Sequence, residues 1–222
     1  MSKEQLRLGN FEPVREEYSS DEIPPGYKKT DVGVIPEDWN IETLDSICDV
    51  RDGTHDSPRY FDQGVPFITS KNIENGRLNR QDVSFISKAD AFLINRRSKV
   101  DKNDILMSMI GTVGDATLIN FEPDFCIKNV ALIKPRNISP SFLINHINST
   151  AFQSYLLDNL YGGIQSFIAL GTLRKLKIPI PPEVEQNSIA EVLTDVDNLI
   201  ESLDNLIRKK QAIKEATMQQ LL

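Results

Sequence analysis

The sequence is poor in the residues that build disulfide scaffolds, metal sites and membrane spans. Only two cysteines and two histidines occur in 222 residues, and Cys48 and Cys126 do not stand at the spacing of a paired motif. This usage is typical of a reducing compartment and excludes a secreted disulfide framework. No apolar run reaches the roughly 18 residues that span a bilayer, and the polar N-terminus does not resemble a signal peptide. We therefore expect a soluble, cytoplasmic protein.

Residues that would form a catalytic or cofactor site are equally scarce. The string Ile23–Tyr27 lacks the polar first residue and the aromatic fourth residue of a methyltransferase tetrapeptide, and Gly111–Gly114 lacks the spacing of a phosphate loop. His146 is interpreted as a packed or solvated histidine. One polar cluster could hold a metal, although a solvated loop is the favoured interpretation: Asp49, Asp52, His55 and Asp56. We expect no catalytic residues, no cofactor and no metal.

The charge distribution is uneven, although the chain as a whole carries −7. Residues 1–45 have a balance of −6, residues 46–182 a balance of +3, and residues 183–222 a balance of −4. A basic region between acidic ends is compatible with nucleic acid, because a local basic face attracts phosphate whatever the total charge. The excess is small, so a partner would have to supply much of the phosphate neutralisation.

The pattern along the chain predicts three parts. Residues 1–26 are polar, end in Pro-Pro-Gly and indicate a flexible arm. Residues 27–182 mix short apolar runs with turn signals and predict one α/β mixed (α+β) domain. Within it we expect strands at 65–69, 105–110, 116–119, 130–133 and 173–180, and a helix at 141–160 that starts after Ser139-Pro140 and stops at Gly162-Gly163.

The last 40 residues, 183–222, contain no glycine and no proline. Their apolar residues recur at steps of three and four, which predicts one amphipathic helix about 54 Å long. Such a helix is too long to bury its whole apolar stripe on its own domain, so we expect it to pack against a partner helix. The residues assigned to this contact are Leu193, Val196, Leu199, Ile200, Leu203, Leu206 and Ile207.

Three groups of residues together resemble the specificity subunits of type I restriction–modification systems. The first is the opening segment Tyr27–Trp39. The second comprises Asp52–His55, Gly64–Ile73, Asn103–Gly114 and Gly163–Ile168. The third is Ile178–Pro182, followed by Glu185-Gln186, Ile189-Ala190 and Met218–Leu222.

The resemblance implies a target-recognition domain whose loops enter the major groove of double-stranded DNA, followed by a spacer helix. Members of that family have two such domains and two antiparallel helices, bind methyltransferase subunits, and can be joined by restriction subunits. This sequence has one domain, one helix and no internal repeat, so it corresponds to half of that layout. A homodimer formed through the C-terminal helix would rebuild it, and an antiparallel one would bring acidic and basic halves together.

The residues expected to contact DNA lie mainly in the polar segment from Arg51 to Tyr60. Arginine can read guanine edges, asparagine can read adenine, and hydroxyl groups can bind phosphate. The candidates are Arg51, Thr54, His55, Arg59, Tyr60, Lys71, Asn72, Arg96, Arg97 and Gln165. An exposed loop without a partner is the alternative at each position. The alternative for the whole chain is an interaction scaffold that dimerises and never contacts bases.

Overall fold

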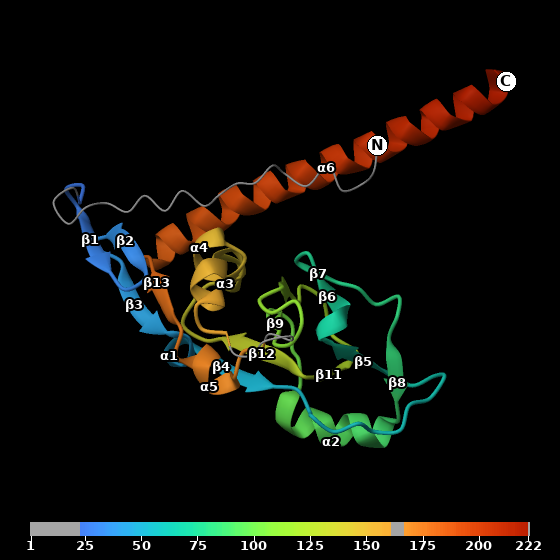
Figure 1. Ribbon diagram of the computed structural model, residues 1–222, viewed down its shortest axis with the longest axis horizontal. Helices are drawn as coiled ribbons and strands as arrows, with labels where there is room; N and C mark the ends of the chain where they lie inside the picture. The colour runs from blue at the N-terminus through green and yellow to red at the C-terminus, as the bar shows by residue number, and fades with distance from the viewer. Residues whose placement is uncertain (1–22, 161–166, 222) are drawn as a thin grey trace.

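Figure 1 shows the computed structural model, in which a mixed α+β domain carries one long C-terminal helix. The structure describes residues 23–160 and 167–221, apart from the side chain of Leu221. The predicted fold class, a mixed domain followed by a single long helix, is confirmed. The predicted arm at residues 1–26 lies outside the described residues up to position 22.

Two antiparallel strand pairs form the end of the domain nearest the start of the long helix. Strands β1 (Tyr27–Thr30) and β2 (Gly33–Pro36) form a hairpin, and Gly33 has a positive φ of 113° in its turn. Strand β3 (Asn40–Thr43) pairs with β13 (Lys177–Ile180), the last strand before the helix. This pairing ties the beginning of the domain to the segment that leads into the helix.

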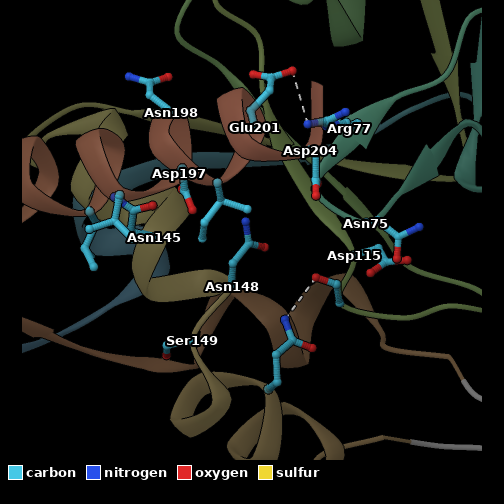
Figure 2. Close-up of a pocket in the computed structure, with 16 residues that line it drawn as sticks. Asn75, Arg77, Asp115, Asn145, Asn148, Ser149, Asp197, Asn198, Glu201 and Asp204 are labelled. Carbon is cyan, nitrogen blue, oxygen red and sulfur yellow. Dashed lines mark hydrogen bonds and ion pairs between the residues drawn. The ribbon is translucent and has the colours of Figure 1, made fainter. Parts of the chain in front are cut away.

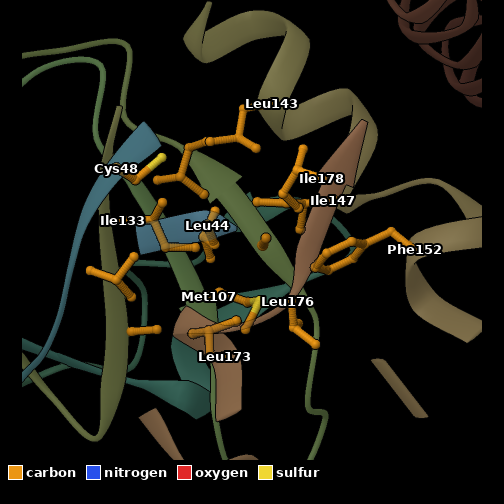
Figure 3. Close-up of a cluster of buried hydrophobic side chains, with 14 of the residues drawn as sticks. Leu44, Cys48, Met107, Ile133, Leu143, Ile147, Phe152, Leu173, Leu176 and Ile178 are labelled. Carbon is orange, nitrogen blue, oxygen red and sulfur yellow. The ribbon is translucent and has the colours of Figure 1, made fainter. Parts of the chain in front are cut away.

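The centre of the domain is a four-stranded antiparallel sheet with the order β10-β9-β12-β4. Its strands are β4 (Cys48–Asp52), β9 (Ile105–Ser108), β10 (Ala116–Leu118) and β12 (Val130–Pro135). Alternate residues of a strand point to opposite faces of a sheet. Ile105 and Met107 accordingly join one hydrophobic cluster, shown in Figure 3, while Leu106 joins another. Burial of both faces explains the unbroken apolar runs in these strands.

A second sheet lies beside the first and forms the other end of the domain (Figure 1). It contains β5 (Val65–Thr69), β8 (Ser84–Ile86) and β11 (Cys126–Lys128), with β11 parallel to β5. Helix α2 (Lys88–Ser98) packs against β11. A short 3-10 helix, η2 (Ser70–Asn72), leads from β5 into the small hairpin formed by β6 (Ile73–Glu74) and β7 (Arg77–Leu78).

The remaining short helices are α1 (Leu44–Ile47), α3 (Pro140–Ile147), α4 (Thr150–Leu157) and α5 (Leu170–Arg174). The single helix predicted over 141–160 is wrong, because the chain forms α3 and α4 with a break at Asn148 and Ser149. The Ser149 hydroxyl accepts a hydrogen bond from the Phe152 amide and caps α4, a local bond that competes with continuing the first helix. Gly162 and Gly163 lie outside the described residues, and α4 ends before them.

The strand predicted over residues 173–180 is correct only in its second half. Residues Lys177–Ile180 form the strand β13, whereas Leu173 and Arg174 belong to helix α5. Leu173 and Leu176 are both buried in the same hydrophobic cluster. Residues three apart share one face of a helical turn but lie on opposite faces of a strand, so the turn lets both leucines reach the core.

Both cysteines are buried, and His146 is half-buried. Cys48 and Cys126 are free and buried. Burial raises the pKa of the Cys48 thiol to about 12 and that of Cys126 to about 11. The His146 ring lies between Phe142 and Phe152, and burial lowers its pKa to about 4. His146 is therefore a neutral packing residue at physiological pH.

Helix α6 (Glu183–Leu221) is 39 residues long and runs from the domain far past it (Figure 1). At 1.5 Å per residue it extends about 58 Å. Its first turns are fixed to the domain: the Gln186 side chain accepts a hydrogen bond from the Ser139 amide (2.9 Å) and donates one to the Pro181 carbonyl (3.0 Å). The Trp39 indole also donates to Glu185 (3.1 Å). No helix in the described part of the chain is long and apolar enough to cross a membrane.

Candidate nucleic-acid interface

The end of β4 positions several of the nominated residues around one buried carboxylate. The side chain of Asp52 is 9% exposed, and its two oxygens bind the Arg97 guanidinium and the His55 Nε2, the latter at 2.8 Å. Arg97 lies in the last turn of α2, and His55 follows β4. Asp52 thus joins the C-terminal end of α2 to the loop that follows β4, although the two segments are far apart in sequence.

Arg51 belongs to strand β4 rather than to a loop, which corrects its predicted position. Its guanidinium donates to Asp49 Oδ2 at 3.1 and 2.6 Å and to the Arg97 carbonyl at 2.9 Å. Arg136 reaches the same Asp49 oxygen at 2.9 Å. The hydrogen bond from Arg51, together with the charges of Arg51 and Arg136, keeps the pKa of Asp49 below its usual value. Arg51 therefore acts mainly as a structural brace within this region.

The loop after β4 approaches the turn between β11 and β12 closely. A Cβ on Gly53 would lie 2.6 Å from the Ile127 carbonyl oxygen, so only glycine fits there without a backbone shift. The Thr54 amide donates to the same carbonyl at 3.2 Å, and His55 Nδ1 lies 2.6 Å from Asn129 Oδ1. Asn129 has a positive φ of 53°, which asparagine tolerates better than most residues. These contacts hold Thr54 and His55 in defined positions at the surface.

Arg59, Tyr60 and Arg96 are exposed. Arg59 is exposed and lies over the Phe61 ring, 5.5 Å from its centroid. The Tyr60 ring packs against Phe67 at 6.3 Å while remaining 49% exposed. Arg96 is exposed near the end of α2. Within the described ranges, no carboxylate lies within ion-pair distance of Arg59 or Arg96, so both cations are available to a phosphate or a base.

Asn72 has a structural role and is not available to read a base. It is 2% exposed, and its amide oxygen accepts from the Thr69 amide and hydroxyl at 3.0 and 3.1 Å. Its amide nitrogen donates to the carbonyls of Asn79 and Asp82. The neighbouring Lys71 is exposed and forms an ion pair with Asp82 at 3.0 Å. Sequence reasoning grouped the two residues, but the turn of η2 points them in different directions.

We expect Asn72→Ala to lower the free energy of unfolding by about 2–3 kcal/mol, because it removes a buried side chain together with its hydrogen bonds to Thr69, Asn79 and Asp82. The adjacent change Lys71→Ala should alter it by less than about 0.5 kcal/mol, since it removes only an exposed ion pair. Urea unfolding followed by circular dichroism measures both values. Equal stabilities for the two variants would contradict the structural role of Asn72.

Gln165 lies outside the described residues, so its contact with DNA stays a prediction.

Two further residues near the loop were missed by sequence reasoning. Lys128 donates to the Ser57 hydroxyl at 2.5 Å, and Asn129 contacts His55 as described above. The available signal was the polar pair that follows the apolar run Phe125–Ile127, but only the pairing of Thr54 with Lys128 brings it beside the loop.

The polar cluster considered as a metal site is arranged as ion pairs. Asp49 faces two guanidinium groups, and Asp52 faces Arg97 and His55. In the part of the chain that the structure describes, no group of three or more histidine, cysteine or acidic residues could hold a metal ion. The arginine side chains of this arrangement can donate hydrogen bonds.

The apolar stripe of α6 is exposed to solvent in the single chain. The seven residues assigned to inter-helix packing are between 43% and 60% exposed. Large apolar side chains in such a continuous row normally lie against another surface. The candidate DNA-contact residues in the segment after β4 and in α2 belong to the end of the domain opposite α6, along which the stripe runs (Figure 1).

Comparison with known proteins relates both parts to one family. The profile of the type I restriction modification DNA specificity domain matches residues 36–214. The putative type I restriction enzyme MjaX specificity subunit of Methanocaldococcus jannaschii is 28% identical over 206 residues, covering 88% of this chain and 48% of the relative. The EcoBI specificity subunit of Escherichia coli is 27% identical over 180 residues, covering 78% and 37%.

Solved structures show the same fold at lower identity. The S subunit from M. genitalium superimposes with a TM-score of 0.55 at 19% identity over 77% of this chain and 42% of that one. The S subunit from Thermoanaerobacter tengcongensis gives 0.54 at 18% identity over 81% and 42%. The chain spans about half the length of the curated relatives it matches. Because the family profile covers the domain and most of α6, the chain belongs to the type I restriction–modification DNA specificity domain family.

Proposed function

We propose that this chain is the non-catalytic subunit that reads the DNA target of a type I restriction–modification complex in the cytoplasm. The observation that carries the proposal is the family match over residues 36–214. The relatives that it resembles are named specificity subunits. The partners of the proposed complex are double-stranded DNA and methyltransferase subunits, to which restriction subunits can be added.

Two copies of the chain would form the working unit. One domain and one helix correspond to 48% and 37% of the two relatives described above. The exposed apolar stripe on α6 is expected to pack against another surface. An antiparallel pair of α6 helices would cover both stripes and place one recognition domain at each end. The seam would be formed by the stripe residues Leu193, Val196, Leu199, Ile200, Leu203, Leu206 and Ile207.

The surface proposed for DNA is the loop after β4 together with the C-terminal end of α2. Arg59 and Tyr60 are exposed in that loop and Arg96 is exposed on α2, while Asp52 binds Arg97 and His55. Lys71 is retained as an outlying candidate for phosphate contact, while Asn72 is omitted because it is buried. Arginine can read guanine edges in the major groove, and arginine and lysine can also bind phosphate.

We expect the target to be an interrupted palindrome, because a two-fold protein reads two equivalent half-sites. The length of the paired helices would set the unread gap between them. The measurement is selection of bound duplexes from a random library by the chain with its methyltransferase subunits, at several salt concentrations. Two unrelated half-sites would contradict the homodimer and point to a different second chain.

The same selection separates the proposal from the interaction scaffold considered above. A scaffold would retain no preferred sequence at any salt concentration, even with the methyltransferase subunits present. A salt-dependent, sequence-selective complex would exclude that alternative. The family match favours DNA recognition.

A further inference from the structure

A groove runs between the first half of α6 and the recognition domain, next to the exposed stripe. It encloses about 790 Å³. Figure 2 shows residues that line it: Asp197 on α6 lies next to Asn145 and Asn148 of the α3–α4 region. Glu201 is joined to Arg77 of β7, and Asp115 directly precedes β10. Leu193, Val196 and Ile200 line it too, so the apolar stripe continues into the groove.

The groove is acidic. Its lining contains four carboxylates, those of Asp115, Asp197, Glu201 and Asp204, and one cation, Arg77. Arg77 pairs with Glu201 at 3.3 Å. Among the residues that the structure describes, no cation lies within ion-pair distance of Asp197 or Asp204. An occupant with apolar and basic side chains would therefore complement this surface.

The second half of α6 has that chemistry and cannot use its own groove. Residues 183–204 contain seven acidic residues and no basic one, whereas residues 205–221 contain Arg208, Lys209, Lys210 and Lys214 with a single acid, Glu215. The basic half extends away from its own domain (Figure 1). In an antiparallel pair of helices, the basic half of each copy returns across the acidic half of the other.

We propose that this groove seats the basic half of α6 from a second copy of the chain, so that each recognition domain is held by the partner's helix as well as by its own. The proposal rests on the homodimer proposed above. It makes the groove a contact between the partner's helix and the domain, in addition to the contact between the two stripes.

Helix geometry identifies the basic residue that faces the groove. Asp197, Glu201, Asp204 and Arg208 are spaced by four, three and four residues, so they lie on one face of α6. A two-fold axis perpendicular to an antiparallel pair keeps equivalent faces on the same side of the pair. Arg208 of the partner subunit therefore comes to the groove side, whereas Lys209 turns by about 100° to another side. Arg208 donates to Asn205 within its own helix at 2.6 Å.

Two charge reversals test this arrangement. The groove variant carries Asp197→Lys with Asp204→Lys, and the helix variant carries Arg208→Glu. Each alone should raise the Kd of the dimer by about tenfold or more, because like charges then meet at both symmetric contacts. Lys209→Glu makes the same charge change as Arg208→Glu at the next position and should leave the Kd within about threefold of the wild-type value. Sedimentation equilibrium of the full chain measures these constants.

Mixing the two variants is the decisive measurement. In the mixed dimer, the reversed groove meets the reversed helix and the native groove meets the native helix, so both contacts are attractive again. Native mass spectrometry of differently tagged chains should show heterodimers in preference to either homodimer. Groove effects confined to a single chain, including weakened α6 helicity, would not be rescued by mixing.

The outcomes are distinguishable. Variants that dimerise as tightly as the wild type, or that are weak and form no heterodimer, would overturn the groove contact while leaving the stripe dimer intact. A wild-type chain that is monomeric at micromolar concentration would overturn the homodimer and the groove contact together.

Discussion

Leu203→Asp should convert the protein from a dimer to a monomer. Leu203 lies in the middle of the stripe and is 49% exposed in the single chain, so its burial depends on a partner. A two-fold pair would bring two unpaired carboxylates into the apolar seam. We expect the Kd of the dimer to rise by about a thousandfold, equivalent to roughly 4 kcal/mol. Sedimentation velocity across a concentration series measures the change.

The matched control for this prediction is Ala216→Asp. Ala216 is exposed on the side of α6 that faces away from the stripe, so the same new charge remains in water. We expect this variant to dimerise like the wild type. The recognition domain should stay folded in both variants, because its core does not include Leu203. Dimers of Leu203→Asp with unchanged affinity would remove the stripe from the interface.

Loss of Arg59 and Arg96 should have the second largest effect, and it should fall on DNA binding. Both side chains are exposed beside the loop that follows β4 and have no carboxylate partner among the described residues. We expect Arg59→Ala with Arg96→Ala to weaken binding of the selected target by about 10- to 100-fold in the complex with methyltransferase subunits. Fluorescence anisotropy at several salt concentrations measures the affinity.

The salt dependence assigns the role of each arginine. Loss of a phosphate contact lowers the salt slope by about one per residue and weakens all sequences alike. Loss of a base contact relaxes the preference at one position of the target. Lys29→Ala with Lys175→Ala removes the same charge from exposed positions on β1 and after α5, and should change the affinity by less than about threefold. An equal loss for both pairs would show a general charge effect and would exclude this loop from the interface.

The positions of the arginines could not be predicted from sequence. Arg51 and Arg97 are separated by 46 positions, yet the Arg51 guanidinium donates to the Arg97 carbonyl and both regions converge on Asp49 and Asp52. Their convergence depends on α2 packing against the second sheet. Nothing in the local pattern indicates which cation is committed to an internal ion pair and which is free. Only the tertiary contacts show that Arg59 and Arg96 have no carboxylate partner among the described residues.

Local hydrogen bonds caused the errors in secondary structure. Ser149 stands in a stretch with a continuous helical spacing of apolar residues, which predicted one helix, but its side chain begins a second one. Leu173 and Leu176 are likewise compatible with a strand by composition. Because both leucines pack in the same hydrophobic cluster, the backbone forms a helical turn there. In both cases the apolar pattern located the buried residues correctly but left the direction of the backbone open.

The sequence by itself determined the class of the fold, the long final helix with its apolar stripe, and the family resemblance that the profile match supports. These features depend on periodicity, on the absence of glycine and proline after residue 183, and on short motifs, all of which are properties of neighbouring residues. Only the tertiary structure decided that Asn72 is a buried brace, that Asp52 joins α2 to the loop after β4, and that an acidic groove lies beside the stripe. These features depend on residues far apart in the chain, and their proximity is set by sheet pairing and core packing.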